Sequence, residues 1–349
     1  MHSSTSNSKT PQIRDIVLLL GACALFCVLL EGGTTFYFAR VSKIENRRES
    51  EYQDAVAIRS ARTHHAASVL VAGNSLLLEG VNFPQLLKAV SPELEPRRLV
   101  VENTFYLDWY YGLRRIFKMG AQPDIVVLML NPIQLTAPAF NGDYSAHLLV
   151  DRGDLLEFAK NTGADRNETS TLAMANLSFF YGSRAEIRTW ILGKLLPGVG
   201  NLFRPPVGSQ KSDVSEQLAA ERLVRLRDLC SSHGSDLVIV LPPARLGIGV
   251  TEVLQAASAS GVKVLLPIAP GVLPASDYSD NFHLNGDGAN RFTPVLATKL
   301  SELWRTGGSS TGNSALSSSP DKRDGDVRPL NAAFVPVQAN PKKRVNLQR

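Results

Sequence analysis

The sequence predicts a three-layer α/β/α domain built on a five-stranded parallel sheet and preceded by one transmembrane helix. Two observations predict this fold class: five short apolar runs alternate with stretches of helical periodicity, and an apolar segment near the N-terminus is long enough to cross a bilayer. The composition, 44% hydrophobic and 20% charged over 349 residues, is typical of a globular chain. The predicted strands are 69–72, 99–102, 125–130, 237–241 and 262–266.

Residues 1–15 are mostly polar and are expected to be disordered, and residues 16–39 form the predicted transmembrane anchor. The hydrocarbon layer is about 30 Å thick and takes roughly 20 helical residues to cross. A cleaved signal peptide is the alternative, because 16–30 alone has the length of a signal-peptide apolar core. No pair of small residues at cleavage-site spacing follows that core, which favours the anchor.

Three further segments flank or interrupt the predicted domain, which covers 66–305. Residues 40–65 carry charges at helical spacing and predict a solvated helical stalk. About one hundred residues separate the third and fourth strands, more than a βα crossover needs, so 140–215 is predicted to be a helical insertion that could cover a pocket. Residues 306–349 are rich in Ser, Gly, Pro and Asn and predict a disordered basic tail. Helices are expected at 110–119, 154–160, 183–196, 214–230 and 291–304, with a Pro/Gly loop at 197–210.

The charge distribution argues against a nucleic-acid partner. Of the net charge of +5, the tail supplies +4, because it holds seven basic and three acidic residues. The predicted domain is therefore near neutral, and it lacks the basic stripe with interleaved aromatics that such a partner needs. The three cysteines, Cys23, Cys27 and Cys230, give neither a disulfide framework nor a metal-binding pattern, so no metal or cofactor is expected.

Two polar stretches can carry chemistry. Gly73-Asn74-Ser75 closes the first predicted strand, at the sheet edge where ligands and nucleophiles usually lie, although a serine there is commonly a helix N-cap. Asp280-Asn-Phe-His283 lies between the fifth strand and the last helix. That spacing lets the aspartate accept a hydrogen bond from imidazole Nδ1 while Nε2 faces outward, but a capping aspartate beside a surface histidine has the same pattern.

Together, the two stretches resemble the first and last sequence blocks of the SGNH or GDSL hydrolases, over residues 66–305. The resemblance implies a flavodoxin-like five-stranded sheet, with Ser75 as nucleophile, His283 as general base and Asp280 as its orienting carboxylate. It also implies oxyanion donors, namely the Ser75 N–H, Asn131 after the third strand, and Asn103 or Thr104 in place of the family's second-block glycine. A polar turn residue before Pro132 is the alternative for Asn131.

The chain departs from the family pattern in three places. Asn74 stands where the first block has an aspartate, the second-block glycine has no clear match, and the third block reads Met129-Leu-Asn131-Pro132 instead of Gly-x-Asn-Asp. These changes leave the triad in place and alter the expected oxyanion geometry. Losing one oxyanion donor can cost about 100-fold or more in turnover, so a weakened or specialised enzyme is one expectation.

The resemblance implies a two-step acyl transfer by a serine esterase or O-acyltransferase, acting on an ester such as an acylated polysaccharide. Membrane-tethered bacterial relatives place the domain on the periplasmic side of the inner membrane. The Lys and Arg count opposes this, because Lys9 and Arg14 precede the span and four basic residues follow it by position 48. The rival interpretation is a catalytically silent binding or scaffold protein of a membrane polysaccharide assembly, and the sequence predicts no oligomeric state.

Two other clusters remain as weaker candidates. Asp143 to His147, in the insertion, could reach the pocket, but a surface loop is favoured. Asp108 to Tyr111, after the second strand, could form a sugar-stacking wall, but the apolar start of a helix is the preferred interpretation.

Overall fold

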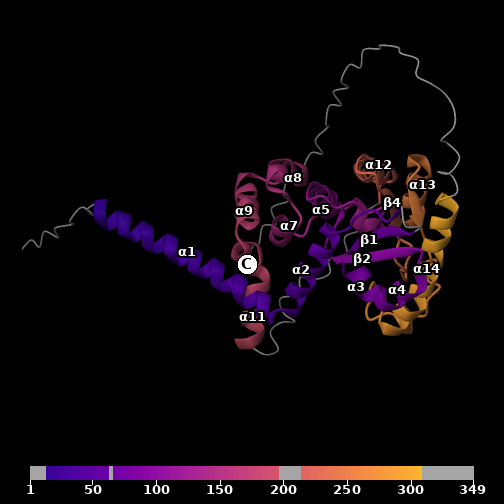
Figure 1. The fold of residues 1–349 in the computed structure, drawn as a ribbon, viewed down its shortest axis with the longest axis horizontal. Helices are drawn as coiled ribbons and strands as arrows, with labels where there is room; N and C mark the ends of the chain where they lie inside the picture. The colour runs from indigo at the N-terminus through magenta and orange to yellow at the C-terminus, as the bar shows by residue number, and fades with distance from the viewer. Residues whose placement is uncertain (1–12, 63–65, 196–213, 309–349) are drawn as a thin grey trace, which may run out of the picture. The chain divides into compact units, whose positions relative to one another are not determined.

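The computed structural model describes residues 13–62, 66–195 and 214–308 (Figure 1). The chain divides into two compact units, residues 1–305 and 306–349. Of the second unit only residues 306–308 are described, and they are the end of a helix. The predicted disorder of residues 1–12 and of the tail, and the whole predicted loop at 197–210, lie outside the described residues.

The sheet has five parallel strands in the order β2-β1-β3-β4-β5. This is the flavodoxin-like order of doubly wound sheets, in which the chain changes direction next to β1 and β3. The predicted fold class is therefore confirmed. The strands are β1 (Ala67–Gly73), β2 (Leu94–Val100), β3 (Ile125–Met129), β4 (Asp236–Val240) and β5 (Lys263–Leu265).

Strand β2 begins five residues earlier than predicted, at Leu94 and not at Leu99. In this edge strand Glu95 and Arg97 are exposed, whereas Leu94 and Pro96 are buried. Pro96 has no N–H to donate to a neighbouring strand, which an edge strand tolerates. A search for continuous apolar runs misses such an alternating segment.

Alternate side chains of the strands pack into two separate hydrophobic clusters, one on each face of the sheet. Leu70 and Ala72 belong to one cluster, and Val69 and Val71 belong to the other. This alternation follows from the two-residue period of a strand and gives the three layers. The first face is covered by α2 (Lys43–Val56), α5 (Tyr106–Lys118), α12 (Glu216–Ser232) and α13 (Val250–Ser260), and the second by α3 (Ser75–Gly80), α4 (Phe83–Val90) and α14 (Gly286–Gly308).

Helix α2 differs from the solvated stalk that the sequence predicts. Arg48, Glu51, Tyr52 and Ala55 are buried at helical spacing, and the helix packs against β2. Glu51 accepts hydrogen bonds from the Val100 N–H at 2.8 Å and from the neighbouring arginine side chain of β2. The charges that suggested a solvated surface therefore pair with the sheet edge, and α2 is part of the domain.

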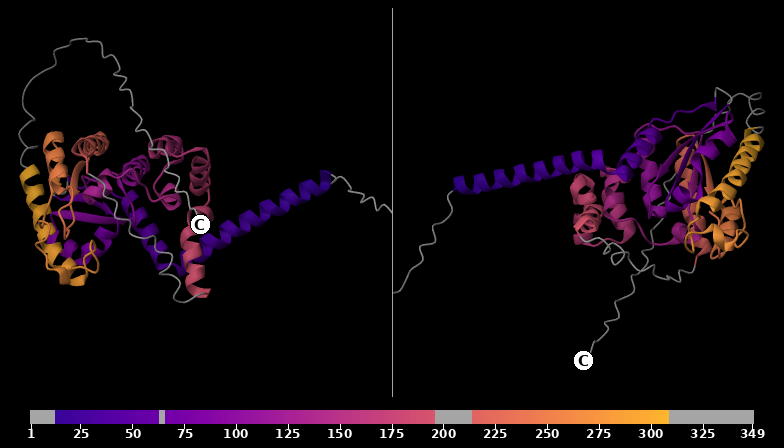
Figure 2. Two further views of the ribbon diagram at one scale, coloured as in Figure 1. Left: turned by 180° about the vertical axis from the view of Figure 1, so that it is seen from behind. Right: turned by 90° about the horizontal axis from the view of Figure 1, so that it is seen from below.

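The segment between β3 and β4 contains α6 (Pro132–Thr136), α7 (Asp143–Leu148), α8 (Leu155–Thr162), α9 (Arg166–Leu177), α10 (Phe179–Gly182) and α11 (Arg184–Leu195). Helices α7, α9 and α10 pack on one another, and α10 packs against α1 (Ile13–Val41). Glu31 of α1 accepts hydrogen bonds from the Phe179 N–H at 2.6 Å and the Ser178 hydroxyl at 2.7 Å. Figures 1 and 2 show the C-terminal end of α1 beside these helices and its N-terminal part extending away from them.

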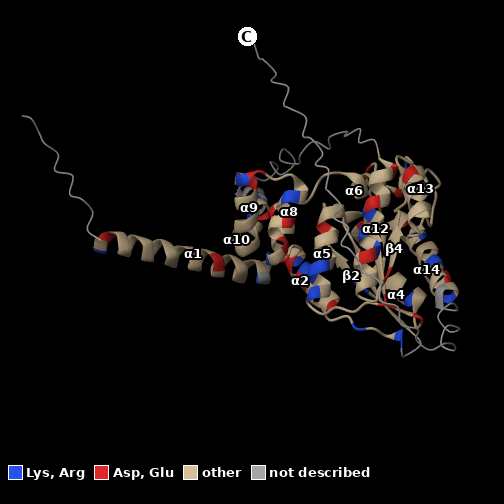
Figure 3. Cartoon of the chain, turned by 90° about the horizontal axis from the view of Figure 1, so that it is seen from above, with Lys and Arg blue, Asp and Glu red and all other residues tan. Residues whose placement is uncertain are grey.

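Helix α1 is long and apolar enough to cross a membrane over the 26 residues Ile13–Phe38, and its most apolar 18 residues have a mean hydropathy of 2.4 and no buried side chain. Figure 3 shows charged positions at the ends of the helix and at one place within it, which its sequence identifies as Glu31. A signal sequence near an N-terminus can have the same length and composition.

Candidate active site

Ser75 is the first residue of α3 and lies directly beyond the carboxyl end of β1. Gly73 ends the strand, where a Cβ atom would lie 3.0 Å from both the Met129 carbonyl oxygen and the Leu77 Cβ. The close approach of β1, β3 and α3 therefore requires a glycine at this position. Asn74 is the N-cap of α3, so the serine hydroxyl is not needed as the helix cap that the alternative interpretation gave it.

His283 reaches Ser75 from the loop between β5 and α14. The distance from Ser75 Oγ to His283 Nε2 is 2.9 Å, and the distance from His283 Nδ1 to Asp280 Oδ2 is 2.7 Å. A carboxylate on Nδ1 favours the tautomer that carries a proton there, which leaves Nε2 as the acceptor facing the serine hydroxyl. The structure thus brings the three predicted triad residues into one hydrogen-bonded chain across more than 200 positions of sequence.

The loop around Asp280 is fixed by its own hydrogen bonds. Asp280 Oδ1 accepts from the Phe282 N–H and the His283 N–H, both at 2.7 Å. Burial by itself raises the pKa of this carboxyl, but the hydrogen bonds from His283 and Phe282 outweigh it and hold the pKa below its usual range. Asp280 is therefore ionised at neutral pH, although its side chain is 53% exposed, which weakens its electrostatic effect on the imidazole.

Asn131 lies two residues beyond Met129, which pairs with Gly73 across β1 and β3, so Asn131 and Ser75 follow neighbouring strand ends. It is the N-cap of α6: its Oδ1 accepts from the Gln134 N–H at 2.8 Å, and its own N–H donates to Gln134 Oε1. Both the capping role and a donor role fit this arrangement. Capping occupies Oδ1, and Nδ2 has no partner among the described residues.

The loop after β2 lies beside the turn that carries Ser75. Thr104 is fully buried, its hydroxyl donates to the Val101 carbonyl oxygen at 2.7 Å, and it accepts from Trp109 Nε1 at 2.9 Å. Asn103 has a φ of 57°, the left-handed conformation that glycine favours and asparagine tolerates. The glycine-like backbone therefore falls on Asn103, and the two hydrogen bonds of the Thr104 hydroxyl hold the loop, so the main-chain N–H groups of this loop are its candidate donors.

The Ser75 N–H belongs to the first turn of α3, where backbone N–H groups have no intrahelical acceptor. Among the described residues no acceptor engages it. It can therefore face a developing negative charge next to the serine hydroxyl. The main-chain position makes this donor independent of the substitution at Asn74.

The two weaker candidate clusters lie in helices. Trp109 and Tyr111 are fully buried in α5, so they cannot form a sugar-stacking wall, in agreement with the preferred interpretation. The favoured surface loop at Asp143 to His147 is instead α7, whose His147 ring packs edge-on against Phe179 at 5.6 Å. Asp143 forms an ion pair with Arg184 at 2.7 Å, so both ends of the cluster hold the insertion together.

Sequence reasoning missed two residues that support the site. Asp108, fully buried, accepts hydrogen bonds from the Phe105 N–H at 2.8 Å, the Asn141 N–H at 3.0 Å and the Ser145 hydroxyl. It thereby joins the loop after β2 to the start of the insertion. Gln134 completes the capping box on Asn131, for which Asn-Pro-Ile-Gln was an available sequence signal. Within 13–62, 66–195 and 214–308, no three His, Cys, Asp or Glu side chains are grouped as metal ligands.

No protein-family model and no curated protein sequence matches the chain. Among solved structures, it is similar to LAE5, an α/β hydrolase from the metagenome of Lake Arreo, Spain, at 12% identity over 69% of this chain and 95% of that one, with a TM-score of 0.36. It is also similar to TesA, at 11% identity over 68% of this chain and 99% of TesA, with a TM-score of 0.34. A third similar structure is Axe2, an acetyl xylan esterase from Geobacillus stearothermophilus, at 14% identity over 71% of this chain and 96% of Axe2, with a TM-score of 0.35. All three likenesses are remote.

Proposed function

We propose that the chain is a serine esterase or O-acyltransferase of the SGNH type, with Ser75 as nucleophile, His283 as general base and Asp280 as the residue that orients the imidazole. The observation that supports this most directly is the continuous hydrogen-bonded chain of Ser75 Oγ, His283 and Asp280, at 2.9 and 2.7 Å. A nucleophile, a base and an orienting group within hydrogen-bonding distance are the parts that nucleophilic acyl transfer needs.

The proposed reaction has two steps. His283 Nε2 takes the Ser75 proton as Oγ attacks the ester carbonyl carbon, and the Ser75 N–H, Asn131 Nδ2 and a main-chain N–H of the Asn103–Thr104 loop bind the oxyanion. The protonated imidazole then gives its proton to the leaving alkoxide, which forms the acyl-enzyme. In the second step His283 deprotonates water or an acceptor hydroxyl, which attacks the acyl carbon and releases Ser75.

The substrate class and location are also part of the proposal. An acylated glycan is supported only by the family resemblance. A single-span anchor is supported by the length and apolarity of α1. We place the domain on the periplasmic side, again from the resemblance, and a reporter fused after Gly308 that is active only in the cytoplasm would contradict that side.

The test of catalysis uses the full chain in detergent. Wild type is expected to hydrolyse p-nitrophenyl acetate and to be labelled by a fluorophosphonate, and Ser75→Ala and His283→Ala are expected to lose turnover. Ser258→Ala, an exposed serine on α13, is the matched control and should behave as wild type. Equal turnover in wild type and both site variants would reject the proposal and favour the silent scaffold. Glycan binding by a wild-type chain that the fluorophosphonate does not label at Ser75 would have the same meaning.

A further inference from the structure

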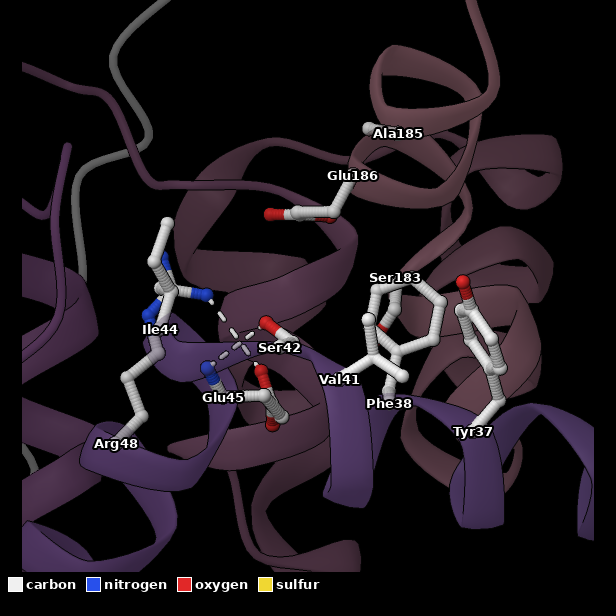
Figure 4. Close-up of a pocket in the computed structure, with 10 residues that line it drawn as sticks. All are labelled: Tyr37, Phe38, Val41, Ser42, Ile44, Glu45, Arg48, Ser183, Ala185 and Glu186. Atoms are coloured by element: carbon white, nitrogen blue, oxygen red, sulfur yellow. Dashed lines mark hydrogen bonds and ion pairs between the residues drawn. The ribbon is translucent and has the colours of Figure 1, made fainter. Parts of the chain in front are cut away.

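A cavity lies at the junction of α1, α2 and α11, and the triad residues do not line it (Figure 4). Its volume is about 400 Å³, within the range of about 300–1,000 Å³ typical of small-molecule sites. Phe38 and Val41 from α1 and Ile44 from α2 give it an apolar wall. We call this cavity the junction pocket.

The position of the junction pocket along α1 relates it to a membrane. At 1.5 Å per residue, the 26-residue apolar stretch is about 39 Å long, which exceeds the hydrocarbon thickness of about 30 Å. Arg14 and Asp15 keep the first turn in water, so a span of about 20 residues ends near Thr35. Tyr37, Phe38 and Val41 then lie at the level of the lipid head groups, where aromatic side chains are enriched.

Two polar groups in the junction pocket lack partners. Ser183 is 2% exposed, and its buried hydroxyl has no hydrogen bond within the described part of the chain. Glu186 Oε2 is likewise buried without a partner there. Buried polar atoms are rarely left unsatisfied, because each costs free energy comparable to a lost hydrogen bond. Figure 4 shows the Glu186 carboxyl group facing the α2 residues across the cavity.

The charges around the pocket select the head group. Arg48 is already paired with Glu102 at 2.8 Å and lies over the Tyr144 ring at 4.2 Å, and Glu45 accepts from the Tyr144 hydroxyl at 3.0 Å. The unsatisfied groups that remain are therefore a carboxyl oxygen and a hydroxyl. Burial raises the pKa of both Glu45 and Glu186 although Arg48 faces them, because that guanidinium is shared between Glu45 at 3.8 Å and Glu102. A phosphate or carboxylate head group would meet these two acidic side chains, whereas a hydroxyl can donate to Glu186 and also bond to Ser183.

We propose that the junction pocket binds a neutral membrane lipid with one hydroxyl-bearing head group and one apolar chain, the chain entering along Phe38 and Val41 and the hydroxyls reaching Ser183 and Glu186. This inference needs α1 to lie in a membrane, as in the proposed function, but it is independent of the triad. The contacts of Glu31 with Ser178 and Phe179 hold the insertion against α1. One wall of the pocket therefore comes from α1 and another from the insertion.

The test is photocrosslinking of the full chain in detergent with a monoacylglycerol that carries a diazirine in its acyl chain, followed by peptide mass spectrometry. Labels are expected on the last turns of α1 and the start of α11, and 1-monooleoylglycerol should compete at lower concentration than oleate. Ala185→Trp, which fills the pocket, should lower labelling, while Ala89→Trp, an exposed alanine on α4, should not. Ser75→Ala should label as wild type, so loss of catalysis and loss of lipid binding are separately visible.

A milder variant keeps the test decisive if Ala185→Trp fails to fold. Glu186→Gln preserves shape and removes the carboxylate, so it should weaken monoacylglycerol labelling by about tenfold and narrow the preference over oleate. Labels spread evenly along α1, equal competition by oleate in wild type, or unchanged labelling in both pocket variants would overturn the proposal. A crosslink from a photoreactive residue at position 41 to protein instead of lipid, in native membranes, would overturn it as well and assign the pocket to a partner helix.

Discussion

The Asn74 side-chain amide donates a hydrogen bond from Nδ2 to the Thr104 carbonyl oxygen at 3.0 Å, which joins the turn after β1 to the loop after β2. The same side chain is fully buried, and its Oδ1 accepts from the Leu76 N–H at 3.0 Å. An aspartate, which the SGNH first block has here, can make the second bond but has no proton for the first. The asparagine therefore ties the candidate oxyanion loop to the turn that carries Ser75.

Replacing Asn74 by aspartate should loosen this tie. The carboxylate would be buried against the Thr104 carbonyl oxygen, so the free energy of unfolding should fall by about 1–3 kcal/mol, with a lower kcat for p-nitrophenyl acetate. Unfolding of the full chain in detergent and initial-rate kinetics measure both effects. The matched control is Asn82→Asp, since Asn82 also caps a helix, α4, while its amide donates to Asn290 at an exposed position, and aspartate is an equally good N-cap. Equal destabilisation in the two variants would contradict the role of the Asn74 amide.

Changes at His283 and Asp280 should differ in size. His283→Gln removes the base and should lower kcat by roughly 10²–10⁴-fold. Asp280→Asn should cost less, because the carboxylate is 53% exposed and the asparagine oxygen can still accept from the Phe282 and His283 N–H groups. The rate of fluorophosphonate labelling at Ser75 gives the same order without a turnover assay. Asp287→Asn, at an exposed position in α14, should match wild type, and a larger loss in Asp280→Asn than in His283→Gln would contradict this assignment of roles.

The strands and the two polar motifs could be predicted because their signals are local, whereas the order of the strands in the sheet was implied only by the family resemblance. Apolar runs mark β1, β3 and β4 directly, and Gly73-Asn74-Ser75 and Asp280-Asn-Phe-His283 each carry their spacing within a few residues. What brings the two motifs together is the parallel topology, which places the ends of successive strands on one edge.

The remaining features depend on partners far apart in sequence. A run of charged residues such as that in α2 predicts a solvated helix when the partners of the charges are unknown. Here the partners are Arg98 and Glu102, which lie about fifty positions away in the sequence. The role of the Asn74 amide likewise depends on a carbonyl oxygen 30 residues later. A pattern of residue types cannot show such pairs, so the sequence suggested a stalk where the structure has a packed helix.

The packing of α2 gives a stability prediction. Glu51 accepts from the Val100 N–H at 2.8 Å and pairs with Arg98 at 2.7 Å, so Glu51→Ala leaves a strand N–H and an arginine without their acceptor. The free energy of unfolding should fall by about 1.5–3 kcal/mol. Glu49→Ala removes an exposed glutamate of the same helix and should change it by less than about 0.5 kcal/mol. Chemical unfolding that gives equal values for both variants would show that α2 is the solvated stalk after all.

Asp108 should make the stability of the chain depend on pH. Its burial raises its pKa to about 6 from 3.8, despite the hydrogen bonds from Ser145, Asn141 and Phe105. Between these values the folded chain holds a proton that the unfolded chain releases, so the unfolded state binds fewer protons and stability falls as the pH rises from about 4 to about 6. At about 1.4 kcal/mol per pKa unit, this contribution is on the order of 3 kcal/mol.

The measurement is the difference in unfolding free energy between wild type and Asp108→Asn at each pH, because other titrating groups then cancel. The difference should change across pH 4–6 and be flat above it, since asparagine does not titrate. Asp228→Asn, an exposed aspartate on α12, should track wild type. Because Asp108 holds the N–H groups of Phe105 and Asn141, its ionisation acts on the loop that carries Asn103 and Thr104. A difference that stays constant from pH 4 to 6 would mean that Asp108 does not titrate there and that the loop is held independently of its charge.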